Sequence, residues 1–375
     1  MDIVIVRNAS YDYEQLRPVF FEIIEKLAGD TIRTGRCVLI KPNMLSAAAP
    51  RDAVLTHPLI VRAAVEYVLE QGARPQVSDS PAIGSFESIL KLNKTADALA
   101  GLDVLCRPFT ETKKVDIGKP YGKIDVARDA LEADVIVNLP KLKTHAQMLL
   151  TLGVKNMFGC IVGFKKSQWH MRAGVDNLAF ARLLVGIHQA LKPAVTILDG
   201  VLALEGEGPG KRGKPRDVGV LMGSTDAFAL DRAVCRMIGI REESMPTLAV
   251  ARMQNLIAPY EIDGVLPEVR NFLLPQKSDL VFGPRLLQGV LRRHAAPLPV
   301  CDDRLCRFCS QCLKICPAQA IKPAEAKKII FNYKSCIRCY CCIEICPYGA
   351  LHLLETPAGK LVRRLVDKNS RDSRG

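Results

Sequence analysis

Ten of the fourteen cysteines lie between residues 301 and 346, and eight of these ten form two copies of one spacing. In each copy three cysteines follow at steps of three residues, and a fourth, before a proline, comes four residues later. Three such thiolates on a tight loop can reach three corners of an iron–sulfur cube, while the fourth, beginning a short helix, points toward a second cube. The spacing therefore predicts two [4Fe–4S] clusters, the first held by Cys306, Cys309, Cys312 and Cys346 and the second by Cys336, Cys339, Cys342 and Cys316.

Structural zinc is the alternative, because CxxC pairs also suit tetrahedral zinc. Zinc sites rarely need three evenly stepped cysteines and a Cys-Pro pair twice over, so the spacing favours iron–sulfur clusters. Cys301 and Cys341 fall outside the pattern, and the doublet Cys341-Cys342 leaves open which neighbour is the ligand, although spacing favours Cys342. Residues 301–356 resemble the two-cluster bacterial-type ferredoxins, and this resemblance implies low-potential, one-electron transfer.

Polar residues in the first 300 positions follow apolar, strand-like runs. In open parallel sheets ligands bind at the carboxyl ends of the strands, so these residues are expected to converge on one pocket. The simpler interpretation is that each is a turn former or a helix N-cap, as Asp226 and the pair Asp199-Gly200 can be. The residues concerned are Lys41 and Asn43, Asp79 and Ser80, Lys141, Lys143 and His145, Asp199, and Ser224, Thr225 and Asp226.

Lys141, Lys143 and His145 alternate with a period of two, which places them on one face if the segment is extended. Such a face suits a carboxylate or phosphate, and lysine or histidine there can transfer a proton. We predict that these three bind or protonate an anionic ligand, with Asp79 and Asp199 orienting the lysines or accepting a proton. The alternative is a solvated basic rim. The predicted substrate-binding residues are Lys41, Asn43, Asn138, Lys155, Asn156, His170 and Asp226.

Two further segments are candidates for contact with this ligand. "KKSQWHMRAG" (165–174) is expected to be a loop that folds over the site, and "EGEGPGKRGKP" (205–215) a glycine-rich turn that approaches a phosphate. The second matches neither GxGxxG nor GxxxxGK[ST], so it is a weak indication of nucleotide binding. No flavin or nicotinamide fingerprint stands in the chain, so electrons are expected to come from a partner protein, such as a ferredoxin or a flavoprotein.

Short apolar runs alternate with amphipathic helical stretches over the first 240 residues, which is typical of βαβ units. We predict an open, mostly parallel sheet with helices on both faces, followed by a small α+β ferredoxin-like domain. The predicted boundaries are 1–285 for the α/β domain, 286–300 for a linker, 301–356 for the cluster domain and 357–375 for a basic tail.

The formal charge of +13 raises the question of an acidic partner surface or nucleic acid. Two clusters with four thiolates each would remove about four positive charges, assuming a net charge of about −2 per oxidised cubane site. With 6% aromatic residues and no aromatic-basic stripe, nucleic acid is disfavoured. The chain contains no apolar run of bilayer length and no recognisable leader, and its cysteines favour reducing surroundings, so we expect a cytoplasmic protein.

Five motifs, "KPN", "NLPKLKTH", "GVKNMFG", "LDG…GPG" and "STDAFALD", lie within residues 40–235. With them, about residues 30–285 resemble the family known as domain of unknown function 362, members of which are often fused to a ferredoxin module. The resemblance implies the architecture and the pocket rather than a particular reaction.

Three functions are compatible with these features. The favoured one is an iron–sulfur oxidoreductase whose clusters pass electrons to or from an anionic small molecule at the strand ends. The second is a non-catalytic electron-transfer subunit that docks a larger redox enzyme. The third is an iron–sulfur sensor that binds nucleic acid or a metabolite.

Overall fold

The computed structural model describes residues 1–163, 165–173, 176–275, 295–325 and 327–360. A ten-stranded sheet dominates the larger domain, in the order β12-β1-β11-β10-β7-β2-β3-β4, with β8 and β9 attached beside β10. All strands on the main path run parallel except β11, which is antiparallel to both β1 and β10. The strands are β1 (Asp2–Asn8), β2 (Cys37–Pro42), β3 (Arg74–Val77), β4 (Leu105–Cys106), β7 (Val135–Leu139), β8 (Lys141–His145), β9 (Leu149–Thr151), β10 (Val195–Gly206), β11 (Gly213–Ser224) and β12 (Tyr260–Gly264).

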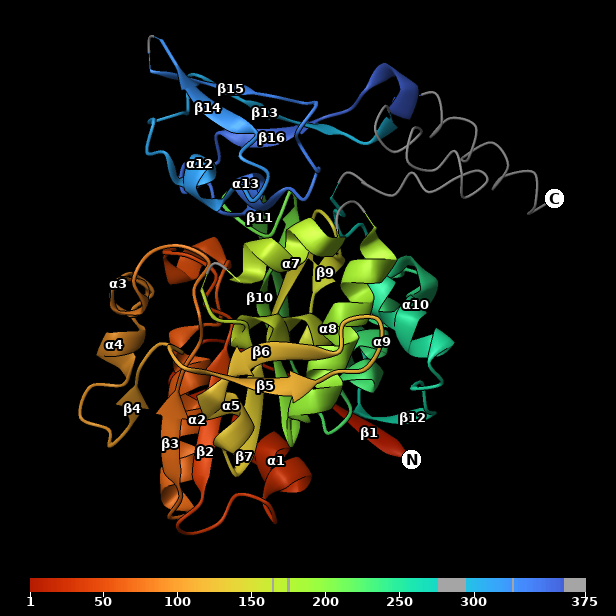
Figure 1. Cartoon of the computed structure of the whole chain (residues 1–375). Helices are drawn as coiled ribbons and strands as arrows, with labels where there is room; N and C mark the ends of the chain where they lie inside the picture. Colours follow the sequence, from red (N-terminus) through yellow and green to blue (C-terminus); the bar gives the residue numbers. More distant parts are fainter. Residues whose placement is uncertain (164, 174–175, 276–294, 326, 361–375) are drawn as a thin grey trace, which may run out of the picture.

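Helices cover both faces of this sheet, because both sides of its central strands are apolar. Along β2, Val38 and Ile40 face one hydrophobic core while Leu39 faces the other. The first core is covered by α1 (Tyr13–Ala28), α2 (Pro58–Glu70), α3 (Phe86–Leu92) and α4 (Thr95–Ala98). The second is covered by α6 (Gly153–Asn156), α8 (Asn177–Leu191), α9 (Ala227–Met237) and α10 (Pro246–Met253). The predicted open, mostly parallel α/β architecture is confirmed (Figure 1).

The order of the strands changes direction between β2 and β7. From β2 the chain proceeds to β3 and β4 on one side, whereas β7 leads to β10 on the other side. Lys41, near the end of β2, is paired in register with Asn138 of β7. Ligands of open α/β sheets bind in the crevice beyond such a switch point. The polar residues at the ends of β2 and β7 thus lie together at the place where the sheet topology favours a binding site.

A hairpin and two short helices complete the larger domain. Strands β5 (Thr112–Asp116) and β6 (Lys123–Ala127) pair antiparallel in a separate sheet, and α5 (Arg128–Glu132) follows them. The segment expected to be a loop at 165–174 contains a helix, α7 (Lys165–Ala173), so that expectation is wrong. Trp169 explains the helix, because its buried ring packs edge-on against Tyr121 from the turn of the hairpin.

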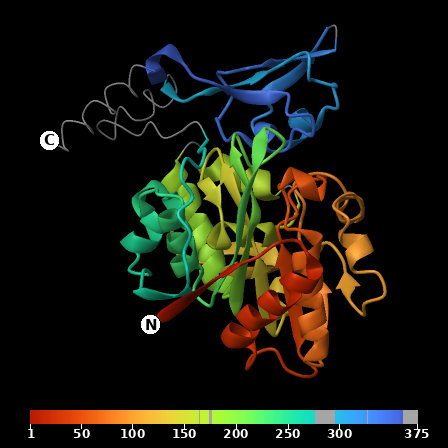
Figure 2. The same ribbon diagram turned by 180° about the vertical axis from the view of Figure 1, so that it is seen from behind.

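The cysteine-rich domain caps the carboxyl edge of the parallel strands, as both views show (Figure 1 and Figure 2). Its two halves repeat a turn, a cysteine loop, a short helix and a strand. The expected helices after the Cys-Pro pairs are turns instead, because Gln319 and Gly349 adopt left-handed backbone angles there, and the helices lie before them. Its elements are β13 (Leu298–Cys301), α12 (Gln311–Ile315), β14 (Ile321–Ala324), β15 (Lys328–Phe331), α13 (Cys341–Glu344) and β16 (Leu351–Leu354).

The predicted linker at 286–300 needs a correction at its end. Residues 298–300 belong to β13, which pairs with β16, because the strand is stabilised by the ladder that closes the cysteine-rich domain. Residues 286–294 and most of the predicted basic tail (361–375) lie outside the described residues.

Candidate functional site between two domains

Each cysteine repeat folds into a loop that encloses a small cavity. Two residues of each loop, Phe308 and Ser310 in the first and Arg338 and Tyr340 in the second, have left-handed backbone angles. Successive residues that alternate in this way turn backbone N–H groups inward, a geometry found at many iron–sulfur sites. The cavities measure about 20 Å³ each. The first is lined by Cys301, Cys306, Cys309, Cys312 and Cys346, and the second by Cys316, Cys336, Cys339, Cys341 and Cys342.

The chemistry of these cavities fits iron–sulfur clusters. The two cysteines that precede prolines already accept backbone hydrogen bonds, Cys316 Sγ from the Ala320 N–H at 3.3 Å and Cys346 Sγ from the Ala350 N–H at 3.2 Å. Zinc requires its thiolates about 2.3 Å from a single point. Among the described residues, no three His, Cys, Asp or Glu side chains converge closely enough to hold one metal ion. The cysteines of each predicted ligand set line one cavity.

A larger cavity, of about 90 Å³, lies between the two domains. One side consists of residues from the carboxyl edge of the sheet and from α6 and α7. The opposite side is made by Ile315, Cys341, Glu344 and Ile345 of the cysteine-rich domain. Cys341 lines this cavity and also the second cysteine cavity. The polar residues of the α/β side are Lys41, Asn43, Asp79, Ser80, Thr151, Lys155, Asn156, Lys166, Ser167 and His170.

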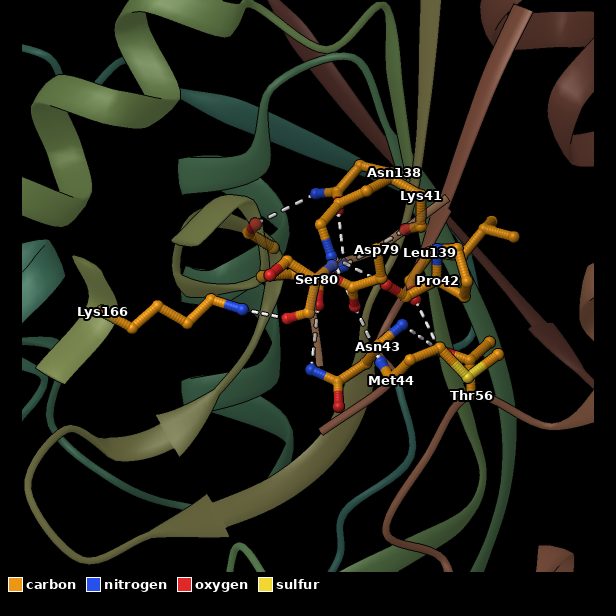
Figure 3. A network of polar contacts seen from close by, with 12 residues as sticks. Lys41, Pro42, Asn43, Met44, Thr56, Asp79, Ser80, Asn138, Leu139 and Lys166 are labelled. Atoms are coloured by element: carbon orange, nitrogen blue, oxygen red, sulfur yellow. Dashed lines mark hydrogen bonds and ion pairs between the residues drawn. The ribbon is translucent and has the colours of Figure 1, made fainter. Parts of the chain in front are cut away.

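A buried ion pair anchors the floor of this cavity (Figure 3). The Nζ atom of Lys41 lies 3.0 Å from Oδ2 of Asp79 and donates to the Pro42 carbonyl at 2.8 Å. Asp79 also accepts the backbone N–H groups of Ser80 at 2.8 Å and Met44 at 2.9 Å. Gly159 closes over the pair, because a Cβ at this position would overlap both Lys41 Nζ and Asp79 Oδ1. The strand-end polar residues of β2 and β3 are thus brought together as predicted.

Three asparagines connect the ends of β2 and β7 to α6. Asn156 donates to Asn138 Oδ1 at 2.8 Å and accepts from Asn43 Nδ2 at 2.9 Å. Asn138 in turn donates to the carbonyl of Gly153 at 3.0 Å. Asn138 does not line the cavity, whereas Asn43 and Asn156 do. This chain of amides fixes the cavity edge, so Asn138 acts through the other two.

The predicted cationic face, Lys141, Lys143 and His145, lies in strand β8, and each of these side chains is about 1% exposed. The solvated basic rim is therefore wrong for this segment. None of the three lines the cavity, because a protein group already occupies the space in front of each. Lys141 Nζ lies 2.8 Å from Asp199 Oδ2 and 2.8 Å from the Tyr11 hydroxyl, which donates to Asp199 Oδ1 at 2.7 Å.

Lys143 has two acceptors of its own, Asn43 Oδ1 and the Val54 carbonyl, both 2.7 Å from Nζ. Burial, together with the nearby Lys155 ammonium, lowers the pKa of Lys143 well below its ordinary value. A neutral amine has two N–H groups, and they match these two acceptors. Burial likewise lowers the pKa of Lys141, although Asp199 opposes that shift.

His145 reaches the other domain, with Nε2 lying 2.8 Å from Oε1 of Glu344. Its Nδ1 accepts the backbone N–H groups of Gln147 and Met148 at 3.1 Å, so a neutral ring carries its proton on Nε2. Burial lowers the pKa of His145 to about 4, against the pull of Glu344. Burial acts to raise the pKa of Glu344, but His145 and Lys155 outweigh it and hold the value at about 2.

Two buried polar atoms on the cavity wall, His170 Nδ1 and Thr151 Oγ1, have no hydrogen-bond partner among the described residues. Within the same part of the chain the half-buried Lys155 ammonium forms no hydrogen bond or ion pair, although the Glu344 carboxylate attracts it. Burial lowers the pKa of Lys155, with Glu344 and Cys341 opposing the shift, and burial lowers the pKa of His170 to about 4. Lys166 donates to the Ser80 carbonyl, and burial lowers the pKa of Lys166 to about 8. Lys155 and His170, which the sequence analysis predicts as ligand contacts, thus both line the cavity.

Asp226 is a correction to the predicted substrate-binding set. It follows β11, and because β11 runs antiparallel to its neighbours, the end of this strand lies at the opposite edge of the sheet from Lys41 and Asp79. Asp226 caps α9 by accepting the Phe228 N–H at 2.8 Å. Asp199 lies inside the long strand β10 rather than at its end, so it is not the turn former that the simpler interpretation expects. It does not line the cavity either.

The glycine-rich turn between β10 and β11 has a structural use. Gly210 packs against the Glu344 carbonyl, 2.7 Å from where a Cβ would stand, and Gly208 packs against Thr144. Arg212 from the same turn donates to the Gly349 carbonyl at 3.0 Å. Gly210 therefore lets the turn approach the cysteine-rich domain closely, and Gly208 lets it approach β8. Among the described residues the turn does not line the interdomain cavity.

Sequence reasoning missed Tyr11, Cys341 and Glu344 as members of this region, whereas Ser80 lines the cavity beside Asp79 as expected. Glu344 and Cys341 come from the other domain, and no pattern in either domain indicates that its wall completes the cavity. Tyr11 stands alone in an exposed-looking loop after β1, where its ring stacks on His57 at 3.5 Å. For Lys166 the sequence predicts only that it belongs to the segment 165–174 that folds over the site.

Comparison with known proteins agrees with this two-part organisation. Residues 38–236 match the family described as "Domain of unknown function (DUF362)", and residues 305–351 match the "4Fe-4S dicluster domain". The "Thylakoid-associated protein sll1697" of Synechocystis sp. is 37% identical over 249 residues, which are 66% of this chain and 77% of that protein.

Among solved structures, the lactate racemase apoprotein from Thermoanaerobacterium thermosaccharolyticum is 12% identical with a TM-score of 0.40. That likeness covers 61% of this chain, and the chain spans 55% of the racemase. No helix among the described residues has the length and apolar character needed to cross a bilayer. The family match over more than half of the chain, together with the similarity to sll1697, shows that the chain is a member of the DUF362 family and carries a C-terminal 4Fe–4S dicluster domain.

Proposed function

We propose that this protein passes electrons between two [4Fe–4S] clusters and an anionic small molecule bound in the interdomain cavity. The observation that carries the proposal is the composition of the cavity wall. Lys155, a cation without a hydrogen bond or ion pair within the described residues, faces a wall that contains Cys341, and Cys341 also lines the second cysteine cavity. A ligand at Lys155 would therefore be separated from the second cluster by little more than one side chain.

The charge balance of the cavity supports an anionic ligand. Three lysines and two carboxylates line it, which leaves one positive charge in excess when all five groups are ionised. Lys41 is paired with Asp79, so Lys155 and Lys166 remain against the Glu344 carboxylate, which attracts Lys155, and one positive charge is left in excess. Uncompensated positive charge away from water is costly, and an anion would relieve this cost. Apolar Met44, Leu45, Ala82, Ile315 and Ile345 would contact the rest of the ligand.

Bound clusters would supply single electrons, and the α/β domain would supply protons and orientation. Lys166 is suited to donate a proton to a reduced ligand, because its pKa of about 8 leaves it protonated at neutral pH but close to release. Asp79 would hold Lys41 in place. In this proposal Lys141, Lys143, His145 and Asp199 position the cavity wall rather than touch the ligand.

The source or destination of the electrons would be a separate redox protein, a ferredoxin or a flavoprotein. The clustering of ten cysteines at residues 301–346 in short CxxC steps supports reducing surroundings and a place in the cytoplasm. The predicted ligand sets, Cys306, Cys309, Cys312 and Cys346 for one cluster and Cys336, Cys339, Cys342 and Cys316 for the other, remain part of the proposal. Each set lines one cavity.

The test is an anaerobic titration of the reduced, cluster-loaded protein. A panel of carboxylates and phosphates is added while visible absorbance and EPR report the oxidation state of the clusters. We expect one class of anion to reoxidise the clusters in the wild type, and Lys155→Met to weaken this response at least tenfold. Lys214→Met, which removes an exposed lysine outside the cavity, is the matched control.

A response that survives Lys155→Met would place the reaction elsewhere and overturn the cavity assignment. Reducible clusters that respond to none of the anions would contradict the oxidoreductase proposal. That result would favour the alternative, an electron-transfer subunit that docks a larger redox enzyme through the same clusters.

A further inference from the structure

The two halves of the cysteine-rich domain differ in their exposure. In the second half Cys339 and Cys342 are each 8% exposed, whereas Cys309 in the first half is exposed. The second half packs against the α/β domain, where Ala82 and Ile83 contact a cluster of side chains that includes Cys339 and Cys341. A redox protein in solution can therefore approach the first cysteine cavity much more closely than the second.

Charged and apolar side chains surround the exposed cavity in the manner of a docking surface. Arg307 and Tyr348 line its rim, and Tyr348 is 48% exposed. Arg304 and Leu305 lie next to it in the chain, and Leu305 is 44% exposed. We call the surface formed by Arg304, Leu305, Arg307 and Tyr348 the outer face.

The charge of the outer face is unbalanced toward positive. The side chains of Arg304, Arg307 and Lys314 form no ion pair with any described residue. Of the neighbouring acids, Asp303 is already paired with Lys328 at 2.9 Å. Asp302 accepts the Arg304 backbone N–H at 2.9 Å and keeps its charge, so Arg304 and Arg307 against Asp302 leave one positive charge in excess. The remaining cations favour a partner with an acidic surface, and an exposed tyrosine and leucine can supply apolar contact at its centre.

We infer that the outer face docks an acidic electron-transfer protein, so that electrons cross the domain from the first cluster to the second. Each encounter would move one electron from the reduced iron–sulfur or flavin centre of the donor to an oxidised cluster, with no bond formed or broken. The donor is oxidised by one electron and the cluster is reduced by one. This inference concerns the partner surface only, so it stands or falls independently of the ligand cavity.

The test uses a plant-type [2Fe–2S] ferredoxin of strongly negative charge as the probe. Its potential of about −400 mV makes it a suitable donor. Binding of the oxidised ferredoxin to the full-length protein is measured by isothermal titration calorimetry, and reduction of the clusters by stopped-flow absorbance, both at low and high salt. We expect salt to weaken binding and to slow reduction, because opposite charges steer the encounter.

Arg304→Glu/Arg307→Glu should raise the Kd and lower the second-order rate constant at low salt by at least about tenfold. The matched control is Arg33→Glu/Arg36→Glu. It makes the same change at the same spacing on exposed residues just before β2, at the opposite edge of the sheet. Reduction by methyl viologen, a small cation, should be no slower in either variant, which shows that the clusters are intact.

Two results would overturn the inference. One is equal loss of binding in the control, which would show a general effect of net charge. The other is unchanged binding in Arg304→Glu/Arg307→Glu, which would show that the ferredoxin docks elsewhere. Tyr348→Ala adds an independent check, since it should weaken binding at high salt as well, where charge steering is screened.

Discussion

His145 Nε2 lies 2.8 Å from Glu344 Oε1, and this contact joins the last residue of β8 to the last residue of α13. It is the point where the "KLKTH" segment of the α/β domain contacts the cysteine-rich domain. Because His145 is held by two backbone N–H groups on its other nitrogen, the ring has little freedom to turn away. This pair therefore helps to fix the orientation of one domain over the other, together with the contacts of Gly210 and Arg212.

Replacement of His145 by alanine should destabilise the holoprotein by about 1–3 kcal/mol, because the buried Glu344 carboxylate would lose its close contact with the His145 ring. At about 2–4 °C per kcal/mol the melting temperature should fall by several degrees, measured anaerobically by circular dichroism. His145→Gln, whose amide can donate, should recover part of the loss. A double-mutant cycle with Glu344→Gln should give a coupling energy above about 0.5 kcal/mol. Additive effects would contradict the role of this contact.

Lys143 and Lys155 should respond differently to the same change. Lys143→Met leaves Asn43 Oδ1 and the Val54 carbonyl without their donor, so it should cost about 1–3 kcal/mol of stability. Lys155→Met removes a cation that makes no hydrogen bond within the described residues, so the relief of its burial offsets its lost attraction to Glu344, and stability should fall less than in Lys143→Met. Anaerobic melting curves of the two variants test this. A larger loss for Lys155→Met would mean that Lys155 is a structural residue.

The sequence was sufficient for features that depend on local spacing. The apolar runs and their flanking helices predict the parallel sheet because both faces of a central strand must be buried. The cysteine spacing predicts two loops because ligands three residues apart constrain the backbone directly. Lys41 and Asp79 are expected near one another because parallel strands end at one edge, and they line the same cavity. Lys155 and Asn156, predicted as ligand contacts, line this cavity from α6.

What the sequence could not show depends on topology and on contacts between the domains. Asp226 was misplaced because nothing in "DVGVLMGS" reveals that this strand runs against its neighbours. Lys141 and Lys143 were assigned to a ligand, yet buried acceptors from distant segments satisfy them. Glu344 was not considered, because its environment is created by docking of the second domain on the first.

Stability should fall as the pH decreases from about 6.5 to 4, because several histidines are buried in the neutral form. Burial lowers the pKa of His188 to about 4, where the ring packs edge-on against Phe228. Between its folded pKa and the unfolded value of about 6.5, the unfolded chain binds the extra proton, and acid therefore favours unfolding. Each such group contributes a slope of up to about 1.4 kcal/mol per pH unit. Anaerobic melting temperatures from pH 7.5 to 5 measure the decline.

His188→Leu isolates one of these groups, because His188 lies in the second hydrophobic core and lines neither the ligand cavity nor a cysteine cavity. The variant should show a shallower decline of melting temperature with falling pH than the wild type, whatever its stability at pH 7.5. Parallel curves for the two proteins would contradict a lowered pKa at His188.

The division of cysteines between the clusters predicts a reciprocal pattern of losses. Cys346→Ser should remove the cluster of the first loop and Cys316→Ser that of the second, so each variant should fall from about eight to about four iron atoms per chain. Cys301→Ser and Cys341→Ser should keep both clusters, because these thiols line the cavities outside the repeated spacing. Iron and acid-labile sulfide content and EPR spectra of anaerobically purified variants report the outcome. If Cys341→Ser loses iron while Cys342→Ser retains it, the doublet is assigned wrongly, and the thiol facing the interdomain cavity is itself a cluster ligand.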